Sequence, residues 1–489
     1  PLARRPLARK GDKVNLCPMQ NTSPLSALID SHTPDLTAMA DRIWATPELL
    51  YAEFASVAEH VTMLHQKGFR VTEDLAGIPT AVMGEAGEGG PVIAILGEYD
   101  ALPGLSQVAG IAEPRPVTPG GNGHGCGHNL LGSGAMLAAC ALKDWLEQTG
   151  TPGRVRYYGC PAEEGGAAKA FMVRDGAFRG VDAAITWHPD SLTRVDDPLS
   201  LANTRADFLF TGKSSHAAAT PHLGRSALDA VELMSVGVNY LREHVPQDAR
   251  IHYAYLDAGG PAPNVVQASA KVRYSIRALQ LSTMLDLVQR VHDVAKGAAL
   301  MTGTSVEMRV FSAVSNMLGN EVLEHLMQEV LESLGGVPFD QADRTYASAI
   351  QATLTPEEIS QPFRRAGIPP RDTPLCDWVA PRKQAGEVMI GSTDVADVSW
   401  AAPLVQVLAA TLAIGTPFHT WQVTAQGMAP AAHKGMTHAA RAMALCAQRL
   451  YCDAPLLAAA KAEHAARLQA EPYRCPIPTE LQPPLVPRP

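Results

Sequence analysis

The chain has 489 residues, of which 46% are hydrophobic and 18% are charged, and its formal net charge is -9. A chain of this length with this many apolar side chains is expected to fold as about two globular domains. The negative charge gives no electrostatic reason to expect a nucleic-acid partner, and the lack of an apolar run of about 18 residues argues against a membrane span.

Cysteine usage and the two ends of the chain bear on where the protein acts. The eight cysteines are scattered without the spacing of a disulfide framework, which predicts thiols in the cytoplasm. Residues 1–18 are basic but lack the apolar segment of a secretory signal, and we expect them to be a foreign or disordered extension. Residues 472–489 are rich in proline and are expected to form an extended or disordered tail.

The first predicted elements are two helices and a strand. Apolar residues recur at helical intervals over 24–44 and 57–64, which predicts two surface helices. The continuous apolar run 92–96 predicts a strand that is buried on both faces of a sheet. It leads into Gly97-Glu98-Tyr99-Asp100, so that carboxylates follow the C-terminal end of the strand, where open α/β sheets bind ligands.

A glycine-rich loop at 121–129 carries a thiol and an imidazole two residues apart. Cys126 and His128 lie among glycines, which allow tight turns and bring side chains close together. Sulfur and imidazole nitrogen are donors that transition metals such as zinc prefer. The Ala- and Leu-rich segment 130–146 is predicted to be helical, so the loop would precede a helix N-terminus. The pair alone does not establish a metal site.

Two further strand ends carry side chains of the same chemistry. Segment 154–159 is predicted to be a strand, and the pair Glu163 and Glu164 follows it closely. Segment 183–187 is predicted to be the next strand and runs into His188. Together with the carboxylates after the first strand, these ends would deliver several metal-binding side chains to one edge of the sheet.

The pattern changes near residue 201 and predicts a separate domain inserted into the first. Its elements follow the order β-α-β-β-α-β, which is the ferredoxin-like arrangement. Strands are predicted at 206–210, 251–256, 265–278 and 305–311, and helices at 226–241 and 283–299. The alternation of strand and helix that characterises the first domain returns over 404–414. The predicted fold class is therefore α/β, with one discontinuous domain over 19–200 and 318–471 and an inserted α+β domain over 201–317.

Five side chains are candidate metal ligands if the fold brings them together: Cys126, His128, Glu164, His188 and, from a small-residue segment late in the chain, His433. Two divalent metals about 3.5–4 Å apart need roughly this many protein donors, with a bridging group and a shared water or hydroxide. Thiolate, imidazole and carboxylate together suit Zn or Mn better than Ca or Mg. Glu163, left unligated beside Glu164, would be the general base that takes a proton from the bridging water.

Several of these motifs together resemble a known family. They are Gly125-Cys126-Gly127-His128, Glu163-Glu164-Gly165, Trp187-His188-Pro189 and His433-Lys434-Gly435. The combination is similar to the amidohydrolase branch of the M20 metallopeptidases, which includes aminobenzoyl-glutamate and auxin-conjugate hydrolases, and the resemblance extends from Leu36 to Leu450. The segments 391–400 and 416–421 are especially similar to the B-type chains of the aminobenzoyl-glutamate hydrolases.

The resemblance implies a fold and a role for residues at matching positions. It implies a metallopeptidase-type catalytic domain with a mixed sheet and flanking helices, and a lid or dimerisation role for the inserted domain. The five candidate ligands match the family's ligands for two divalent metal ions, with Cys126 as the bridge, and Glu163 matches its catalytic glutamate. His216 matches a histidine that, in family dimers, reaches the partner's site and stabilises the developing oxyanion. Asn264 and Arg277 match positions that contact the substrate's carbonyl or carboxylate.

The chain departs from the wider family pattern at Glu98, where many members have a histidine ligand. The branch with a Cys-x-His pair lacks that histidine, so neither Glu98 nor Asp100 is expected to bind metal directly, and Asp100 is a candidate for orienting a ligand. Asp394 and Asp397 either orient ligands or cap a turn. Three further histidines are interpreted as non-catalytic: His222, His419 and His438.

The resemblance and the candidate ligands predict a dinuclear amidohydrolase that cleaves an N-acyl amino acid with an aromatic acyl group, such as p-aminobenzoyl-glutamate. In this hypothesis a metal-bridging hydroxide attacks the amide carbonyl, and Glu163 passes the proton to the leaving amine. The expected assembly is a cytoplasmic homodimer, and a requirement for a second, related type of chain stays open. The alternatives are a hydrolase that removes an amino group from an aromatic acid and a non-catalytic protein that binds a conjugate on the same scaffold.

Overall fold

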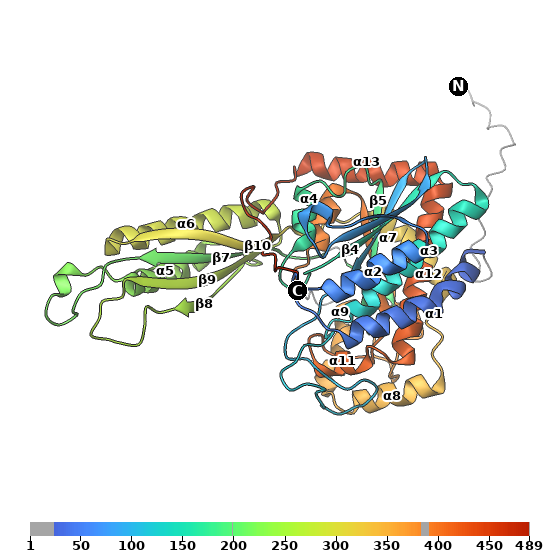
Figure 1. Cartoon of the computed structure of the whole chain (residues 1–489), viewed down its shortest axis with the longest axis horizontal. Helices are drawn as coiled ribbons and strands as arrows, with labels where there is room; N and C mark the ends of the chain where they lie inside the picture. Colours follow the sequence, from blue (N-terminus) through green and yellow to red (C-terminus); the bar gives the residue numbers. More distant parts are fainter. Residues whose placement is uncertain (1–23, 198, 383–390, 489) are drawn as a thin grey trace, which may run out of the picture.

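The computed structural model describes residues 24–197, 199–382 and 391–488. It has a larger α/β body and a smaller lobe, which projects from one side of the body and contains the strands drawn in green and yellow-green (Figure 1). The predicted N-terminal extension, 1–18, lies outside the described residues. Within the described ranges, no helix combines the length and apolar character needed to cross a bilayer.

The body is organised around a seven-stranded mixed sheet. Its strands are β1 (Arg70–Thr72), β2 (Val82–Glu88), β3 (Val92–Glu98), β4 (Gly153–Cys160), β5 (Ala183–Asp190), β6 (Arg194–Val195) and β11 (Leu404–Ala410). They lie in the order β1-β2-β4-β3-β5-β11-β6. Strands β4, β3, β5 and β11 run parallel, whereas β1, β2 and β6 pair antiparallel with their neighbours. The predicted α/β fold with a mixed sheet is confirmed, and the four parallel strands end at one common edge.

Both faces of this sheet are covered by helices. On β3, Ile93 and Ile95 belong to one core, whereas the alternating residues Ala94 and Leu96 belong to a second core on the other face. Every residue of β3 is buried, as the apolar run predicted. The first core also receives α1 (Pro24–Ala45), α2 (Phe54–Gln66), α3 (His128–Thr149), α7 (Glu321–Leu334), α12 (Pro430–Cys452) and α13 (Ala454–Ala470), and the second receives α4 (Ala168–Arg174) and α10 (Val395–Ala401).

Further helices complete the body beside β11. They are α8 (Gln341–Gln351), α9 (Pro356–Ala366) and α11 (Trp421–Gln426), with the short 3₁₀ helix η1 (Leu75–Gly77) near β2. Phe363 of α9 packs against Ala410, the last residue of β11, and Ile414, which follows the strand. These contacts hold the segment after β11 against the body, and that segment leads to the site.

The smaller lobe contains a second, antiparallel sheet. Its elements are β7 (Ala202–Thr211), α5 (Ala227–Leu241), β8 (Arg250–Asp257), β9 (Ser269–Ala278), α6 (Leu281–Thr302) and β10 (Ser305–Val314), with η2 (Pro221–Leu223) and η3 (Arg242–His244) in connections. The sheet order is β10-β7-β9-β8, and apolar residues of one face, such as Phe208 and Tyr274, pack against α5 and α6. The elements follow the predicted β-α-β-β-α-β order; the domain boundaries and the lid or dimerisation role stay predictions.

The proline-rich tail has no helix or strand over its described part, 472–488, and lies against the body. Ile477 is buried in the second core, and the ring of Tyr473 lies 5.7 Å from that of Trp400. The guanidinium of Arg174 donates hydrogen bonds to the carbonyls of Pro478 and Leu481. These contacts give the extended segment fixed partners on the body.

A pair of glycines lets α3 approach β3 closely. A Cβ at Gly97 on β3 would lie 2.9 Å from the Cα of Gly132 on α3. A Cβ at Gly132 would lie 2.6 Å from the carbonyl oxygen of Glu98, closer than real side chains approach. Because neither glycine has a side chain, the helix packs directly on the strand, and its first residue, His128, is held over the strand's C-terminal end.

Replacing Gly132 with alanine is expected to lower the free energy of unfolding by about 1–3 kcal/mol, because the added methyl group meets backbone that cannot move aside. Gly297→Ala is the matched control: this glycine is exposed on α6, and nothing lies within 4 Å of the added carbon. The free energy of unfolding of the control should rise by about 0.5–1 kcal/mol, because alanine has a higher helix propensity than glycine. Denaturant titration of both variants measures the difference, and a stable Gly132→Ala protein would contradict the close contact.

Candidate metal centre

The C-terminal ends of three parallel strands meet beside the start of α3. Glu98 at the end of β3 is in register with Cys160 at the end of β4, and His188 lies near the end of β5. The loop after β4 carries Glu163 and Glu164, and the backbone N–H of Glu164 donates to Asp100 Oδ2 at 2.9 Å. The parallel arrangement thus brings together side chains that are far apart in the sequence.

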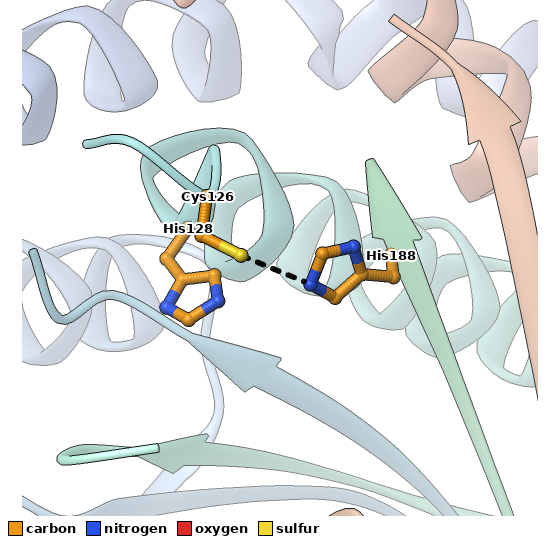
Figure 2. Close-up of side chains that lie close together, drawn as sticks. All are labelled: Cys126, His128 and His188. Carbon is orange, nitrogen blue, oxygen red and sulfur yellow. Dashed lines mark hydrogen bonds between the residues drawn. The ribbon is translucent and has the colours of Figure 1, made fainter. Parts of the chain in front are cut away.

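Cys126, His128 and His188 form the first group of donors. One ligand atom from each lies within 4.8 Å of the others, and Cys126 Sγ is 3.4 Å from His188 Nε2. Figure 2 shows the two side chains at the start of the helix facing the histidine on the strand. The two imidazole rings are nearly perpendicular, at 87°, with centroids 5.8 Å apart. These three predicted ligands are brought together.

A second group shares its sulfur with the first. Cys126, Glu164 and His419 also offer donor atoms within 4.8 Å of one another, and His419 Nε2 lies 3.2 Å from Glu164 Oε2. A thiolate that belongs to two adjacent donor groups is suited to bridging two metal ions. The predicted bridging role of Cys126 is therefore compatible with its position.

Hydrogen bonds orient the two histidines of the first group. His128 Nδ1 lies 2.9 Å from Asp100 Oδ1, and His188 Nδ1 lies 2.7 Å from the carbonyl oxygen of Pro189. Both partners are acceptors, so each Nδ1 carries the proton in the neutral ring and each Nε2 keeps a lone pair. Metal-binding histidines commonly have such a carboxylate or carbonyl behind them. Asp100 thus has the position of an orienting group, as the sequence suggested.

Two buried atoms of the groups make no hydrogen bond of acceptable geometry among the described residues. They are His128 Nε2 and Glu164 Oε1, although His128 Nε2 lies 3.3 Å from Glu98 Oε2. Leaving a buried polar atom unsatisfied typically costs about 1–3 kcal/mol, so such atoms normally have a partner. A divalent metal would give both atoms that partner, and a set of thiol, imidazole and carboxylate donors fits Zn or Mn. The residues present therefore fit a dinuclear transition-metal site.

The adjacent glutamates have opposite electrostatic settings. Burial and the carboxylates of Glu98 and Glu164 raise the pKa of Glu163 well above its usual value. Burial also opposes ionisation of Glu164, but a hydrogen bond from His419 and the charge of His128 hold its pKa below the usual value. Both glutamates line a cavity of about 150 Å³. One carboxyl group is thus suited to carrying a proton and the other to binding a cation.

Glu98 and Lys169 belong to a charged network behind the site that the sequence did not reveal. Lys169 Nζ is fully buried and lies 2.7 Å from Glu98 Oε1 and 2.6 Å from Asp394 Oδ1. The other oxygen of Glu98 lies 3.3 Å from His128 Nε2, and Glu98, His128 and Glu163 form a third group of donors. The role left open for Asp394 is therefore the binding of Lys169. The sequence around Lys169 gave no signal for this contact.

The structure places one predicted ligand, His433, apart from the donor groups of the described residues. This histidine lies in the first turn of α12, not in a loop, and its Nε2 lies 2.9 Å from Asp41 Oδ1 of α1. None of the three donor groups found among the described residues contains it. The late histidine beside Glu164 is His419, which the sequence interpretation placed outside the site. His419 follows β11, so the rule that ligands gather after parallel strands would have selected it.

The remaining predicted residues lie in the smaller lobe. His216 and Asn264 are exposed on neighbouring loops, where the backbone N–H of Ala217 donates to the carbonyl of Asn264. Arg277 is half-buried on β9, and its Nε is 3.4 Å from Ser275 Oγ. None of the three is part of the donor groups formed by the described residues, so their roles in catalysis and substrate binding stay predictions.

Replacing His419 and His433 separately tests which of the two histidines binds metal. His419→Ala should weaken metal binding by at least about 10–100-fold, the loss already seen when a group that merely orients a ligand is removed. His433→Ala should keep the metal content of the unmodified protein, because its partner is Asp41. Metal analysis after dialysis against a weak chelator measures both variants. Loss of metal from the His433 variant alone would favour His433 as the ligand.

Comparison with known proteins gives relatives of one enzyme class. The chain is 46% identical over 466 residues to the B-type chain of p-aminobenzoyl-glutamate hydrolase of Escherichia coli (strain K12), covering 93% of this chain and 97% of that protein. It is 31% identical over 292 residues to Xaa-Arg dipeptidase of Mus musculus, covering 57% and 63%. It is 29% identical over 242 residues to the A-type chain of the same E. coli hydrolase, covering 47% and 54%.

Solved structures share the fold. A dinuclear metal-binding M20 peptidase from Bacillus subtilis matches with a TM-score of 0.53 and 18% identity, covering 85% of this chain and 99% of that one. An aminobenzoyl-glutamate utilization protein from Klebsiella pneumoniae matches with a TM-score of 0.53 and 18% identity, covering 84% and 98%. At this identity the likeness establishes the architecture of the chain.

The family assignment rests on sequence over most of the chain. The model of peptidase family M20/M25/M40 matches residues 94–444, a range that includes all three donor groups and most of both sheets. The B-type relative from E. coli extends that match over nearly the whole chain. The chain therefore belongs to peptidase family M20/M25/M40 and is a metal-dependent hydrolase of amide or peptide bonds.

Proposed function

We propose that this chain is a dinuclear amidohydrolase that cleaves the amide bond of an N-acyl amino acid with an aromatic acyl group. The observation that carries the proposal is the pair of donor groups that share Cys126, next to a glutamate pair whose pKa values are shifted in opposite directions. The names of the E. coli relatives make p-aminobenzoyl-glutamate the first substrate to test.

The proposed mechanism assigns separate tasks to the side chains of the site. Cys126, His128, Glu164, His188 and His419 would hold two divalent ions, Zn or Mn. When bound, such ions make water acidic enough to act as a nucleophile near neutral pH and polarise the substrate carbonyl. Glu163 takes the proton from the attacking water and delivers it to the nitrogen of the leaving amino acid. Its raised pKa favours the acid form that protonates the leaving amine.

His216 is proposed to stabilise the oxyanion in the site of a second copy of the chain. Its Nδ1 lies 3.2 Å and 3.1 Å from the backbone N–H groups of Ala218 and Ala219, which donate to it. In the neutral ring the proton is therefore on Nε2, and this exposed atom is a hydrogen-bond donor. A donor aimed at developing negative charge is what amide hydrolysis requires.

A homodimer would bring that histidine to its target, and the edge of the second sheet supports such an assembly. β8 is the last strand of the sheet order, and Tyr253, Tyr255 and Leu256 are exposed on it. An exposed apolar edge strand is a natural surface for pairing with another chain. The E. coli relatives are named as two different chains of one hydrolase, so a second, related type of chain is also part of the proposal.

Asn264 and Arg277 are proposed to bind the carbonyl or carboxylate of the substrate, Asn264 from the same exposed loop region as His216. A guanidinium binds a carboxylate through two parallel hydrogen bonds, which suits Arg277 to an anionic substrate. Both residues lie on the smaller lobe, so this lobe would supply recognition while the body supplies the metal centre.

Glu163→Gln should lower kcat by about 10²–10⁴-fold, because the amide cannot accept or deliver a proton. The metal content should not change, since Glu163 is not in the two groups that share Cys126. Steady-state kinetics and metal analysis on the same preparation give both numbers. Full activity in this variant would remove Glu163 from the mechanism.

A product assay tests the reaction itself. The protein, reconstituted separately with Zn and with Mn, should release free glutamate and p-aminobenzoate from p-aminobenzoyl-glutamate, and other N-aroyl amino acids should follow with lower kcat/KM. Release of ammonia without free amino acid would favour a deaminase instead. Tight binding of the conjugate by metal-loaded protein, with neither product formed, would favour a binding protein.

A further inference from the structure

One face of the second sheet is polar, and its end adjoins the metal centre. On β7, Asn203 and Arg205 alternate with Ala202, Thr204 and Ala206, and β9 places Arg277 opposite Asn203 and Ser275 opposite Arg205. The intervening residues point to the helices on the other face: Thr204 Oγ1 donates to Met284 Sδ of α6, and Ala206 packs in the core with α5 and α6. The polar face therefore points away from the helices of the lobe.

Arg205 reaches the same cavity as the catalytic glutamates. Arg205 and Asn203 line this cavity of about 150 Å³ together with Glu163, Glu164 and His419. The Nη1 atom of Arg205 would lie 3.4 Å from a Cβ placed on Gly165, the residue that follows the glutamate pair. The guanidinium thus lies beside the cavity that the two glutamates line. The sequence analysis did not select Arg205 as a site residue.

The positive charge of Arg205 is not neutralised by a carboxylate of the described residues. Arg273, on the same face of the sheet, offers the contrast, because its Nε lies 2.6 Å from Asp207 Oδ1. Neither Arg205 nor Arg277 has an ion pair of this kind in the described part of the chain. Arg277 lies opposite Asn203, diagonally across from Arg205 on the same face of the sheet. Burial, and then the charge of Arg205, lower the pKa of Arg277. Two adjacent half-buried cations form a site for anionic groups.

We propose that Arg205 and Arg277 form a cationic subsite, lined also by Asn203, that selects leaving groups with two carboxylates, that is, dicarboxylic amino acids. The inference rests on the proposed amidohydrolase function and adds Arg205 as a specificity-determining residue. With the scissile amide at the metal centre, the leaving amino acid extends toward this subsite, and each guanidinium binds one of its carboxylates. A monocarboxylic leaving group leaves one cation without a partner and a neutral one leaves both, which lowers the relative affinity for such substrates.

The test compares three substrates in the metal-loaded enzyme. They are p-aminobenzoyl-glutamate, its side-chain amide p-aminobenzoyl-glutamine, and its α-amide p-aminobenzoyl-isoglutamine. The unmodified enzyme should prefer the dicarboxylate over both amides in kcat/KM. In Arg205→Met, one of these two preferences should fall by about 10–100-fold, the range of a charge-assisted hydrogen bond, and the other should persist because Arg277 remains. The loss should appear mainly in KM for the dicarboxylate.

Arg273→Met is the matched control, because it removes an arginine from the same face whose charge Asp207 already balances. It should leave both preferences unchanged. If Arg205→Met also leaves both preferences unchanged, or if the control changes them equally, the subsite is wrong even though the hydrolase function stands.

A binding measurement separates this inference from the proposed function. Titration calorimetry with glutarate, a simple dicarboxylate, should give at least about tenfold weaker binding to Arg205→Met than to the unmodified protein. If the enzyme releases no amino acid from any substrate but glutarate binding depends on Arg205, the subsite stands and the proposed reaction fails. If glutarate binds both proteins equally, the subsite fails.

Discussion

The metal centre depends on the close packing of α3 on β3. Because Gly97 and Gly132 lack side chains, the helix lies near enough for its first residue to be placed between Asp100 and Glu98. The orientation of His128 then follows from the carboxylate behind it, and Cys126, two residues earlier, points at the histidine of β5. A displaced helix would move both donors away from those on the neighbouring strands. The close packing of the α3 backbone on the β3 backbone therefore determines the geometry of the metal centre.

Charge is the second constraint on this site. Glu98 and Asp394 share Lys169, and burial makes such a pair costly unless each charge keeps its partner. Glu164 has a histidine beside it, whereas Glu163 has carboxylates as its main electrostatic neighbours. The resulting excess of negative charge around a thiol and two oriented imidazoles favours divalent cations over other ligands. The difference between the adjacent glutamates arises from what surrounds each of them.

Much of the fold and part of the site were predictable because they follow from local patterns. The apolar run of β3, the glycine loop before α3 and the residues after β4 and β5 each predicted a strand end or a helix start, and parallel strands share an edge. His433 was favoured over His419 because it lies in a family motif, although the position of His419 after a parallel strand pointed to the site. The structure shows that His433 lies in a helix that begins at Pro430. Lys169 and Arg205 depend on contacts between segments distant in sequence, for which no pattern along the chain exists. The element order of the inserted lobe was predictable; the direction of its polar face was not.

The cavity beside Glu163 has walls from two separate units of the fold. The acids and the histidine come from loops after parallel strands of the body, whereas Asn203 and Arg205 come from a strand of the smaller lobe. Asn203 and Arg205 are not members of the hydrophobic cores that the described residues form on the two faces of the body's sheet, whereas Val314 of β10, opposite Asn203, packs into the second of them. The wall of the lobe can therefore change its charge and shape through surface substitutions while the metal-binding wall keeps its packing. Such a division allows one catalytic scaffold to diversify its range of substrates by small steps, each with little cost in stability.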